Sequence, residues 1–223
     1  MCGRYSQTLT PQQIDEAFGP VTVPDEASLE PNYNVAPTQL SPVITNREPG
    51  QVQLYEWGLV PFWSKDGKNN ARMINARSET ILEKASFRKP VRERRCLVLG
   101  DSFYEWRRDG KLKLPFRIRR PGQLGLCFAG IWEYWKDREN PEHERLTFSI
   151  ITTAPNAEME AVHNRMPVIL PTAQAREAWL GELRDQDITE LLATPPDGLL
   201  ELYPVSTQVN SVRNNGPELH ERA

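Results

Sequence analysis

Six short segments rich in apolar and β-branched residues constrain most strongly how this chain can fold. Each is three to nine residues long, and turn residues such as Asp109-Gly110 and Pro121-Gly122 separate them. Short apolar runs bounded by Gly and Pro are typical of β-strands. The predicted strands are Pro42–Thr45, Val52–Trp57, Cys96–Leu99, Phe116–Ile118, Leu124–Trp132 and Thr147–Thr152.

Helical patterns are fewer. Thr10, Pro11 and Gln13 supply an N-cap, a first-turn proline and a side chain that reaches back, which predicts a helix through about Phe18. The other predicted helices are Ser78–Lys84, Asn156–His163, Thr172–Leu183 and Ile188–Ala193. We therefore expect an α+β fold, with a mostly antiparallel or mixed, barrel-like sheet and a few peripheral helices.

The length favours a single domain. The 223 residues, 39% of them hydrophobic, suit one core, because single cores stop growing near ~250–300 residues. No repeat or composition break interrupts residues 1–223. Four prolines after Gly19 predict a loop over 19–37, and we expect residues 219–223 to be a disordered tail. We expect a monomer.

The chain lacks the sequence features of secretion and membrane insertion. The start, Met1-Cys2-Gly3-Arg4-Tyr5-Ser6, has no apolar stretch, and nowhere do about 18 apolar residues follow one another. We expect a cytoplasmic protein, or a nuclear one in a eukaryote. Cysteines 2, 96 and 127 cannot all pair and lack zinc-site spacing, so we expect reduced thiols and no metal. Phosphate-loop and dinucleotide fingerprints are also absent, so no nucleotide cofactor is implied.

Charge is distributed unevenly along the chain. The formal net charge of -3 argues against a protein that coats duplex DNA nonspecifically, because such proteins neutralise many phosphates. Residues 65–120, however, carry 17 Lys and Arg against 7 Asp and Glu. This segment either faces an anion or spreads its charges over a solvated surface.

Cys2 is the strongest indication of chemistry. Removal of Met1 would leave an α-amine and a thiol on neighbouring carbons, with ordinary pKa values of about 7.7–8.0 and about 8.5. Such a 1,2-aminothiol condenses with an aldehyde, first to an imine and then to a five-membered thiazolidine. The alternative is that Cys2 is simply a second residue without a role.

Two further candidates hold polar side chains near predicted structural junctions. Asn75 lies where an apolar approach meets a predicted helix cap, and Arg77 follows it. The amide suits a carbonyl or hydroxyl, and the guanidinium suits a phosphate oxygen. A turn Asn that satisfies backbone groups is the alternative for Asn75.

Glu105 and His163 are candidates for proton transfer. Glu105 lies among the aromatic residues of Phe103-Tyr104-Glu105-Trp106, and burial would raise its pKa. An edge-strand Glu paired with a nearby arginine is the alternative. His163 ends a helical run before Pro167 and titrates near neutral pH unless perturbed. A histidine that only complements the helix dipole is the alternative there.

Aromatic and basic residues alternate around Trp57–Trp63 and Tyr104–Arg108. Single-stranded nucleic acids are commonly held by such surfaces, with bases against rings and phosphates on cations. Most tryptophans in a domain of this size are core residues, so we expect Trp57 and Trp132 to be buried. Cys96 and Cys127 lie within apolar strands and are predicted core thiols.

The ordered set of motifs resembles the SOS-response-associated peptidase family, in particular its bacterial abasic-site-processing members and their vertebrate 5-hydroxymethylcytosine-binding counterpart. The resemblance runs from Cys2 to about Glu218. It rests on Met1-Cys2-Gly3-Arg4, Tyr33-Asn34-Val35-Ala36-Pro37, Trp57-Gly58-Leu59-Val60-Pro61, Ile74-Asn75-Ala76-Arg77-Ser78-Glu79, Phe103-Tyr104-Glu105-Trp106, His163 through Met166-Pro167, Pro204-Val205-Ser206 and Val209-Asn210.

The resemblance implies a covalent DNA-damage chemistry without cofactors. Cys2 would form a thiazolidine with the ring-opened aldehyde of an abasic site in single-stranded DNA, and would also remove Met1 autocatalytically. Asn75 would position the sugar, Glu105 would transfer protons, and His163 would act on the sugar hydroxyl. The implied DNA contacts are Arg4 and Arg77 to phosphates, with Asn34, Pro37, Trp63 and Trp106 shaping the strand channel. The protein would associate with the nucleoid when bound to DNA.

One departure and two rival functions accompany this resemblance. The family's Pro-Ala-Asp-Gly approach to Glu105 reads Leu99-Gly100-Asp101-Ser102 here, which predicts a reshaped turn. A glutamine amidotransferase with an N-terminal cysteine nucleophile also begins Met-Cys-Gly, but its downstream segments are absent. A non-catalytic reader of single-stranded or modified DNA would explain the aromatic and basic residues while leaving Cys2 without a role.

Overall fold

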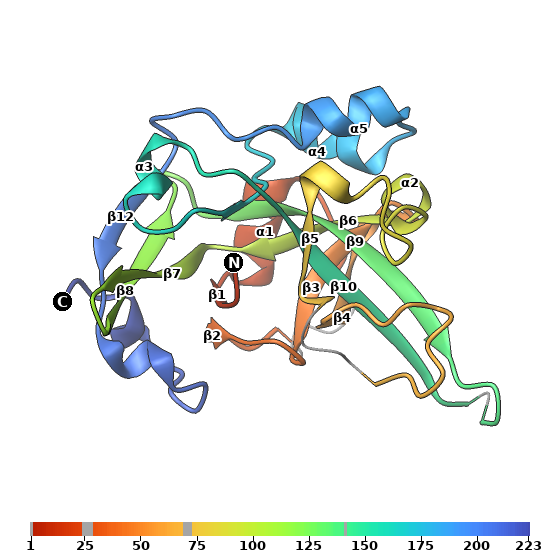
Figure 1. Ribbon diagram of the computed structural model, residues 1–223, viewed down its shortest axis with the longest axis horizontal. Helices are drawn as coiled ribbons and strands as arrows, with labels where there is room; N and C mark the ends of the chain where they lie inside the picture. Colours follow the sequence, from red (N-terminus) through yellow and green to blue (C-terminus); the bar gives the residue numbers. More distant parts are fainter. Residues whose placement is uncertain (1, 24–28, 69–72, 141) are drawn as a thin grey trace.

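A closed, mixed five-stranded barrel lies at the centre of the computed structural model, which describes residues 2–23, 29–68, 73–140 and 142–223. The strand order is β10-β4-β3-β6-β9, and pairing of β9 with β10 closes the ring. Only the β4–β10 pair of this ring is parallel. Its strands are β3 (Leu40–Thr45), β4 (Glu48–Trp57), β6 (Arg95–Gly100), β9 (Leu126–Lys136) and β10 (Glu144–Thr153). The predicted fold class is confirmed (Figure 1).

The barrel strands are buried on both faces. Val98 and Ile150 belong to one hydrophobic cluster, whereas their neighbours Leu97 and Ile151 belong to another. The second cluster includes Trp179 and Ile188 from helices that cover the barrel. Because both faces are covered, these strands appear in the sequence as nearly continuous apolar runs rather than as alternating patterns.

A second sheet carries the chain away from the barrel. Its order is β12-β8-β7-β1-β2, made of β12 (Glu201–Pro204), β8 (Leu112–Arg119), β7 (Ser102–Asp109), β1 (Tyr5–Gln7) and β2 (Asn32–Val35). The chain passes from β6 into β7 at Gly100, where a Cβ atom would lie 3.0 Å from the carbonyl oxygen of Ser6. The two sheets are thus joined where β1 approaches β7.

The predicted loop over 19–37 is wrong at its end, because residues 32–35 form β2. These residues are mostly polar, so the sequence shows no strand pattern there. Pairing with β1, with Tyr5 opposite Val35, creates the strand through a contact distant in sequence.

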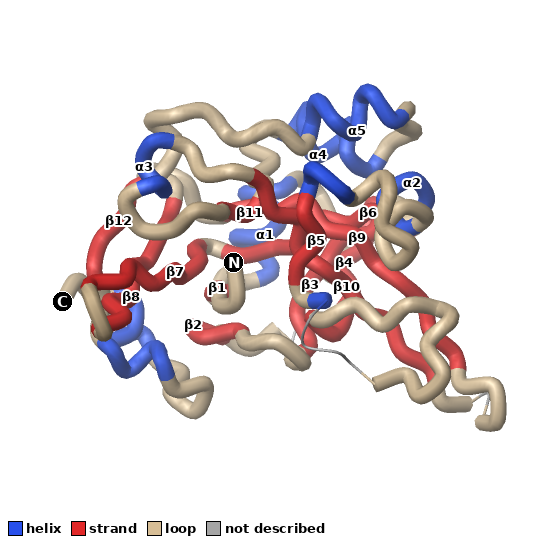
Figure 2. The backbone as a smooth tube through the Cα atoms, in the orientation of Figure 1, coloured by secondary structure: helices blue, strands red, loops and turns tan. Residues whose placement is uncertain are grey.

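The helices lie around the sheets (Figure 2). The predicted first helix is confirmed as α1 (Pro11–Phe18), with reciprocal capping bonds between Thr10 and Gln13. Two more predictions are confirmed as α4 (Ala173–Leu180) and α5 (Asp185–Leu191), whereas α2 (Pro90–Glu93) was not predicted. The remaining elements are α3 (Ala157–Glu160), β5 (Asn75–Arg77), β11 (Met166–Pro167), and the 3-10 turns η3 (Ser78–Thr80), η4 (Thr207–Asn210) and η5 (Pro217–His220).

Two predicted helices are much shorter than expected. Over Ser78–Lys84 only the turn η3 forms, because Ser78 does not act as the N-cap and no side chain caps this turn. Over Asn156–His163 the Asn156 cap is present, but α3 ends at Glu160. The chain then turns, and the amide of His163 donates to the carbonyl of Met159 at 2.8 Å.

The C-terminal residues do not form the disordered tail that we predicted. Leu219 is fully buried against the cluster that contains Tyr104 and Tyr203. The amide of Ala223 donates to the carbonyl of Pro204 at 3.0 Å, and the Arg222 guanidinium lies 4.3 Å from the Tyr203 ring centroid. Burial of the Leu219 side chain stabilises an ordered C-terminal segment, although most residues around it are polar.

Much of the positive charge of residues 65–120 is used inside the fold. Arg92 pairs with Asp185, and Arg119 pairs with Glu201. Arg94 pairs with the buried Glu133 at 3.0 Å. Acidic side chains outside residues 65–120 therefore form ion pairs with these cations. Within the described residues no helix is long and apolar enough to cross a membrane.

Asp101 holds β1 against β7. One carboxylate oxygen accepts from the hydroxyl of Ser6 at 2.5 Å and faces Arg117 at 3.3 Å, and the other accepts from the Thr8 amide at 2.8 Å. The Ser102 hydroxyl also donates to this carboxylate at 3.0 Å. The unusual Gly-Asp-Ser turn is thus a hydrogen-bonded junction between the sheets.

We expect Asp101→Ala to lower the free energy of unfolding by roughly 3 kcal/mol, because it removes the carboxylate partner of the half-buried Arg117 and leaves several buried donors without their acceptor. Urea unfolding would measure the change. Glu142→Ala, at an exposed position, is the control and should alter stability by less than about 0.5 kcal/mol. A loss below about 1 kcal/mol for the Asp101 variant would contradict this role.

Candidate functional site

Cys2 lies in the core, three residues before the start of β1. It is fully buried and packs in the cluster that includes Tyr5, Trp57 and Phe103. Burial raises the pKa of the Cys2 thiol well above its ordinary range, and the negative charge of Glu105 raises it further. The thiol is therefore protonated near neutral pH and requires a base before it can act as a nucleophile.

Asn75 contacts Cys2 directly. It begins β5, which runs parallel to β10 with Asn75 opposite Ile150. Its amide nitrogen donates to the carbonyl oxygen of Cys2 at 2.8 Å. Its amide oxygen is buried and has no hydrogen-bond partner among the described residues. The side chain thus holds the N-terminal backbone and presents an available acceptor.

Glu105 lies on the central part of the second sheet, between β8 and β1. Its side chain is 3% exposed, so the alternative of an edge-strand glutamate is wrong. Side chains alternate between the two faces of β7 here, since Phe103 and Tyr104 belong to different hydrophobic clusters. Burial raises the pKa of Glu105 to about 7. Both its acid and its base form are populated near neutral pH, as proton transfer requires.

His163 lies beyond the end of α3 and faces Glu105. Its Nε2 is 4.0 Å from a carboxylate oxygen of Glu105. Its Nδ1 lies 3.1 Å from the amide nitrogen and 3.2 Å from the carbonyl oxygen of Arg165, so it accepts from the first in one tautomer and donates to the second in the other. Burial lowers the pKa of His163, so the neutral form predominates at pH 7. The ring therefore directs its Nε2 toward Glu105.

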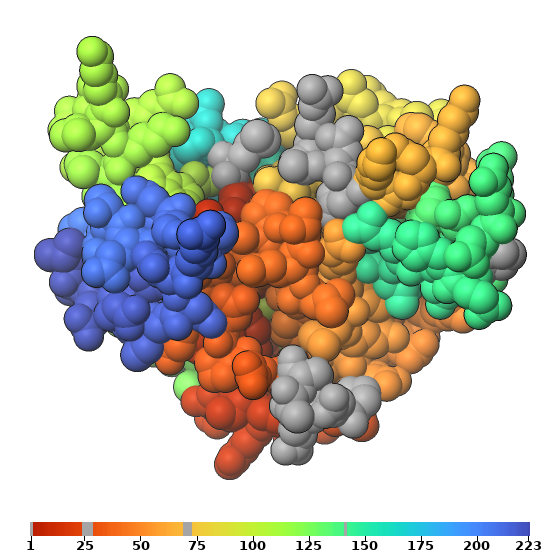
Figure 3. Space-filling model, turned by 90° about the horizontal axis from the view of Figure 1, so that it is seen from below, coloured from red at the N-terminus to blue at the C-terminus, as the bar shows by residue number. Residues whose placement is uncertain are grey.

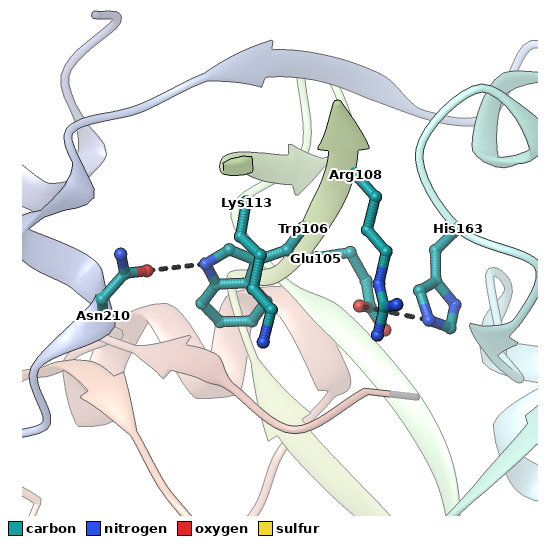
Figure 4. A pocket seen from close by; sticks show the side chains of 6 residues that line it. All are labelled: Glu105, Trp106, Arg108, Lys113, His163 and Asn210. Atoms are coloured by element: carbon teal, nitrogen blue, oxygen red, sulfur yellow. Dashed lines mark hydrogen bonds and ion pairs between the residues drawn. The ribbon is translucent and has the colours of Figure 1, made fainter. Parts of the chain in front are cut away.

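A pocket of about 360 Å³ opens over this pair. Figure 4 shows Asn210 and His163 at opposite ends, with Trp106, Lys113 and Arg108 between them. The indole nitrogen of Trp106 donates to the side-chain oxygen of Asn210 at 2.7 Å. The pocket combines an aromatic wall, two cations and a buried acid.

Lys113 was not predicted, whereas Arg108 falls in the aromatic and basic segment Tyr104–Arg108 and Asn210 in the motif Val209-Asn210, without a specific role having been assigned to either. Arg108 and Lys113 are direct partners in the β7–β8 ladder, on either side of the Asp109-Gly110 turn. Interpreting Asp109-Gly110 as the turn of a β-hairpin would have placed both cations on the same face of the sheet. Asn210 comes from a distant turn, and no local pattern connects it to Trp106.

Arg4 and Asn34 form a structural pair. The Arg4 guanidinium donates to the side-chain oxygen of Asn34 at 2.7 Å and to the carbonyl of Val209 at 2.8 Å. Asn34 is 1% exposed, and its amide nitrogen donates to the carbonyls of Ser211 and Asn214. The pair attaches the C-terminal segment, including the turn that carries Asn210, to β1 and β2.

The other predicted DNA contacts lie at or near the surface. Trp63 is 48% exposed in the loop after β4, and Arg77 is exposed at the end of β5. Pro37 is partly exposed beside Thr38, whose φ of 74° is unusual for a β-branched residue. In the space-filling view the yellow-green β7–β8 segment projects at one edge, beside the blue C-terminal segment (Figure 3).

The core predictions for the other candidates are confirmed. Trp57 is fully buried and Trp132 is 4% exposed, and Cys96 and Cys127 are buried free thiols. Among the residues that the structure describes, no group of three or more His, Cys, Asp or Glu side chains is placed to hold a metal ion.

Comparison with known proteins identifies related chains. The model of the SOS response associated peptidase family matches residues 1–212. The abasic site processing protein YoqW of Bacillus subtilis is 43% identical over 226 residues, covering 99% of both chains. The abasic site processing protein HMCES of Gallus gallus is 32% identical over 260 residues, covering 98% of this chain and 76% of that one.

Solved structures share the fold. A protein from Bacteroides thetaiotaomicron superposes with a TM-score of 0.90 at 31% identity, covering 100% of both chains. A protein from Bordetella bronchiseptica gives a TM-score of 0.77 at 21% identity, covering 92% of this chain and 100% of that one.

The raised pKa of Glu105 predicts that the difference in stability between the wild type and Glu105→Gln changes with pH. The folded state holds this proton more tightly than the unfolded state, whose pKa is near 4.5, so Glu105 lowers stability as pH rises from about 4.5 to about 7. We expect the stability of Glu105→Gln relative to wild type to increase by up to about 3 kcal/mol over that range. Urea unfolding at pH 5 and pH 8 would measure it, with the exposed Glu142→Gln as control. A pH-independent difference would show that the carboxyl titrates normally.

Proposed function

The chain belongs to the SOS response associated peptidase family, and from this premise we propose that Cys2, once Met1 is removed, bonds covalently to abasic sites in single-stranded DNA. Processing of abasic sites is the activity stated in the names of its relatives. The observation that carries the proposal is the contact of Asn75 with the Cys2 carbonyl at 2.8 Å, close to a facing Glu105–His163 pair.

The proposed reaction has two steps, imine formation and ring closure. The α-amine of Cys2 attacks the aldehyde carbon of the ring-opened sugar, and loss of one water gives an imine. The thiol then adds to the imine carbon while the nitrogen gains a proton, which closes the thiazolidine. Cys2 itself is fully buried, and shielding of the reacting groups from bulk water favours both condensation and retention of the product.

Glu105 is the proton carrier for these steps. Since burial keeps its pKa at about 7, the carboxylate can accept a proton from the amine, and the acid can return one to the departing hydroxyl. The Cys2 thiol has a raised pKa, so its attack also depends on a nearby base. Glu105 is the buried carboxylate whose charge acts on that thiol.

His163 and Asn75 hold the sugar. His163 lines the pocket, and its Nε2 suits proton exchange with the hydroxyl oxygen released on ring opening. The available amide oxygen of Asn75 suits a hydroxyl donor from the same sugar. Together they favour the open-chain aldehyde over the closed ring.

The pocket cations and aromatic wall suit a single DNA strand. Arg108 and Lys113 provide positive charge beside the reacting groups, and Trp106 provides a ring face for a base or sugar. Arg77 and Trp63 are exposed and are further candidates for DNA contact, while the buried Asn34 and Arg4 hold the turn that carries Asn210. Cys2 also removes Met1, and the finished adduct shields the damaged strand. Strand cleavage through the same imine is a competing lyase outcome.

We expect the wild-type protein to form a band that survives heat and detergent with an oligonucleotide carrying one abasic site. Cys2→Ala should abolish it, because both the thiol and ring closure are lost, and an undamaged strand should give none. Denaturing gel electrophoresis would measure this, with intact mass establishing that Met1 is absent. Cys96→Ala, which alters another buried thiol, is the matched control and should crosslink normally.

Other results would favour the rival functions. Reversible, salt-sensitive binding that is unchanged in Cys2→Ala would identify a non-catalytic reader, because phosphate contacts weaken with salt whereas a thiazolidine does not. Release of ammonia from glutamine would identify an amidotransferase. Absence of a stable band from protein that lacks Met1 would contradict the covalent proposal.

The proton-transfer roles predict separate kinetic effects. Glu105→Gln should slow crosslinking by about 10²-fold or more, and the wild-type rate should fall below pH 7 as the carboxyl is protonated. His163→Ala and Asn75→Ala should also slow it. Quenched time courses would give the rates, with Glu142→Gln as control. Wild-type rates in the His163 and Asn75 variants would show that those two assignments are wrong.

A further inference from the structure

A second polar pocket lies away from the Cys2 site, between the end of α1 and the start of α4. Its volume is about 350 Å³. Arg120, just after β8, and Arg176, on α4, both line it, together with the Phe18 ring and the buried Cys127. None of its lining residues lines the pocket at Glu105 and His163.

The two arginines have no acidic partner within the described part of the chain. Arg120 donates to the carbonyl of Pro171 at 2.9 Å, and Arg176 donates to the carbonyl of Ala17 at 3.3 Å. Each guanidinium has five N–H donors, so most of this capacity is not used by these contacts. The Nε of Arg176 is buried and has no hydrogen-bond partner among the described residues.

The electrostatics of the pocket favour an anion. Burial and the charge of Arg176 lower the pKa of Arg120, which shows that the two cations repel one another at this site. The first residue of α4, Ala173, also lines the pocket, so the positive end of the helix dipole adds to the field. A buried donor without an acceptor destabilises the folded state, and a bound anion would supply the missing acceptor.

We propose that this pocket binds the phosphate group of a small phosphorylated molecule, held between Arg120 and Arg176. Two guanidinium groups match a phosphate dianion in charge and in planar hydrogen-bonding geometry. Glu16 also lines the pocket, so its charged lining residues are two arginines and one glutamate, and the arginine pair leaves a net positive charge. The Phe18 ring, 5.7 Å from the Arg176 guanidinium carbon, provides an apolar wall for the rest of the ligand.

Calorimetric titration of the full chain with inorganic phosphate, at constant ionic strength, tests this proposal. We expect Arg120→Gln and Arg176→Gln each to weaken phosphate binding at least tenfold. Arg138→Gln, at an exposed arginine, and Arg108→Gln, in the pocket near Glu105, should change it less than twofold. Unchanged affinity in both Arg120→Gln and Arg176→Gln, or loss only in Arg108→Gln, would overturn the proposal.

A second variant avoids the removal of a native contact. Ala173→Glu places a carboxylate at the pocket, where it should abolish phosphate binding and raise the melting temperature by pairing with the arginines. Gln174→Glu is the matched control, because it adds the same charge to the first turn of α4 at an exposed position that does not line the pocket. Equal effects of the two substitutions on phosphate binding would contradict the site.

An undamaged single-stranded oligonucleotide distinguishes a free phosphate ligand from a DNA phosphate. We expect Arg120→Gln and Arg176→Gln to bind it as wild type does. If both variants weaken oligonucleotide binding while inorganic phosphate fails to bind the wild type, the arginine pair belongs to the DNA surface and the proposal fails.

Discussion

The pairing of β1 with β7 is the contact on which the candidate site depends. Tyr5 lies opposite Phe103, and the amide of Tyr104 donates to the carbonyl of Arg4 at 3.0 Å. Continuing this antiparallel register toward the N-terminus brings Gly3 opposite Glu105, with Cys2 as its neighbour in the chain. Asp101 secures the pair through buried hydrogen bonds, so a turn outside the pocket determines the relative position of nucleophile and proton carrier. A one-residue slip would reverse the faces and separate these groups.

Burial shifts all three titratable groups of the site toward their neutral forms. It raises the pKa values of the Cys2 thiol and the Glu105 carboxyl and lowers that of His163. Near neutral pH the thiol and the imidazole are therefore mostly uncharged, and the carboxyl is partly protonated. The cations Arg108 and Lys113 line the pocket beside these groups. This arrangement suits DNA with an abasic site, because the cations can contact the phosphates while the largely uncharged reacting groups meet the uncharged aldehyde of the sugar. Condensation needs proton relay rather than a permanently charged nucleophile, and a carboxyl with a pKa of about 7 provides that relay.

The cations of residues 65–120 are divided among three uses. Some pair with acidic side chains elsewhere, as Arg92 does with Asp185 and Arg119 with Glu201. Others, including Arg108 and Lys113, line the pocket at Glu105. Arg120 lies with Arg176 at the second pocket, where backbone carbonyls are their hydrogen-bond partners among the described residues. Net charge along the sequence could not distinguish these uses, because the partners are remote in sequence and meet only in the folded chain.

The sequence by itself determined the barrel strands, the capped helix α1 and the four residues Cys2, Asn75, Glu105 and His163 as candidates. Apolar runs and capping bonds are local, so they are readable without the fold; the four candidates depended on their motifs and on resemblance to a family. Only the tertiary structure decided that residues 32–35 form β2, that Leu219 anchors the C-terminus, and that Arg108, Lys113 and Asn210 line the site. These features arise from pairing and burial between segments far apart in the chain. A short polar strand or a single apolar residue has no local signal, because its stabilisation comes entirely from its distant partner.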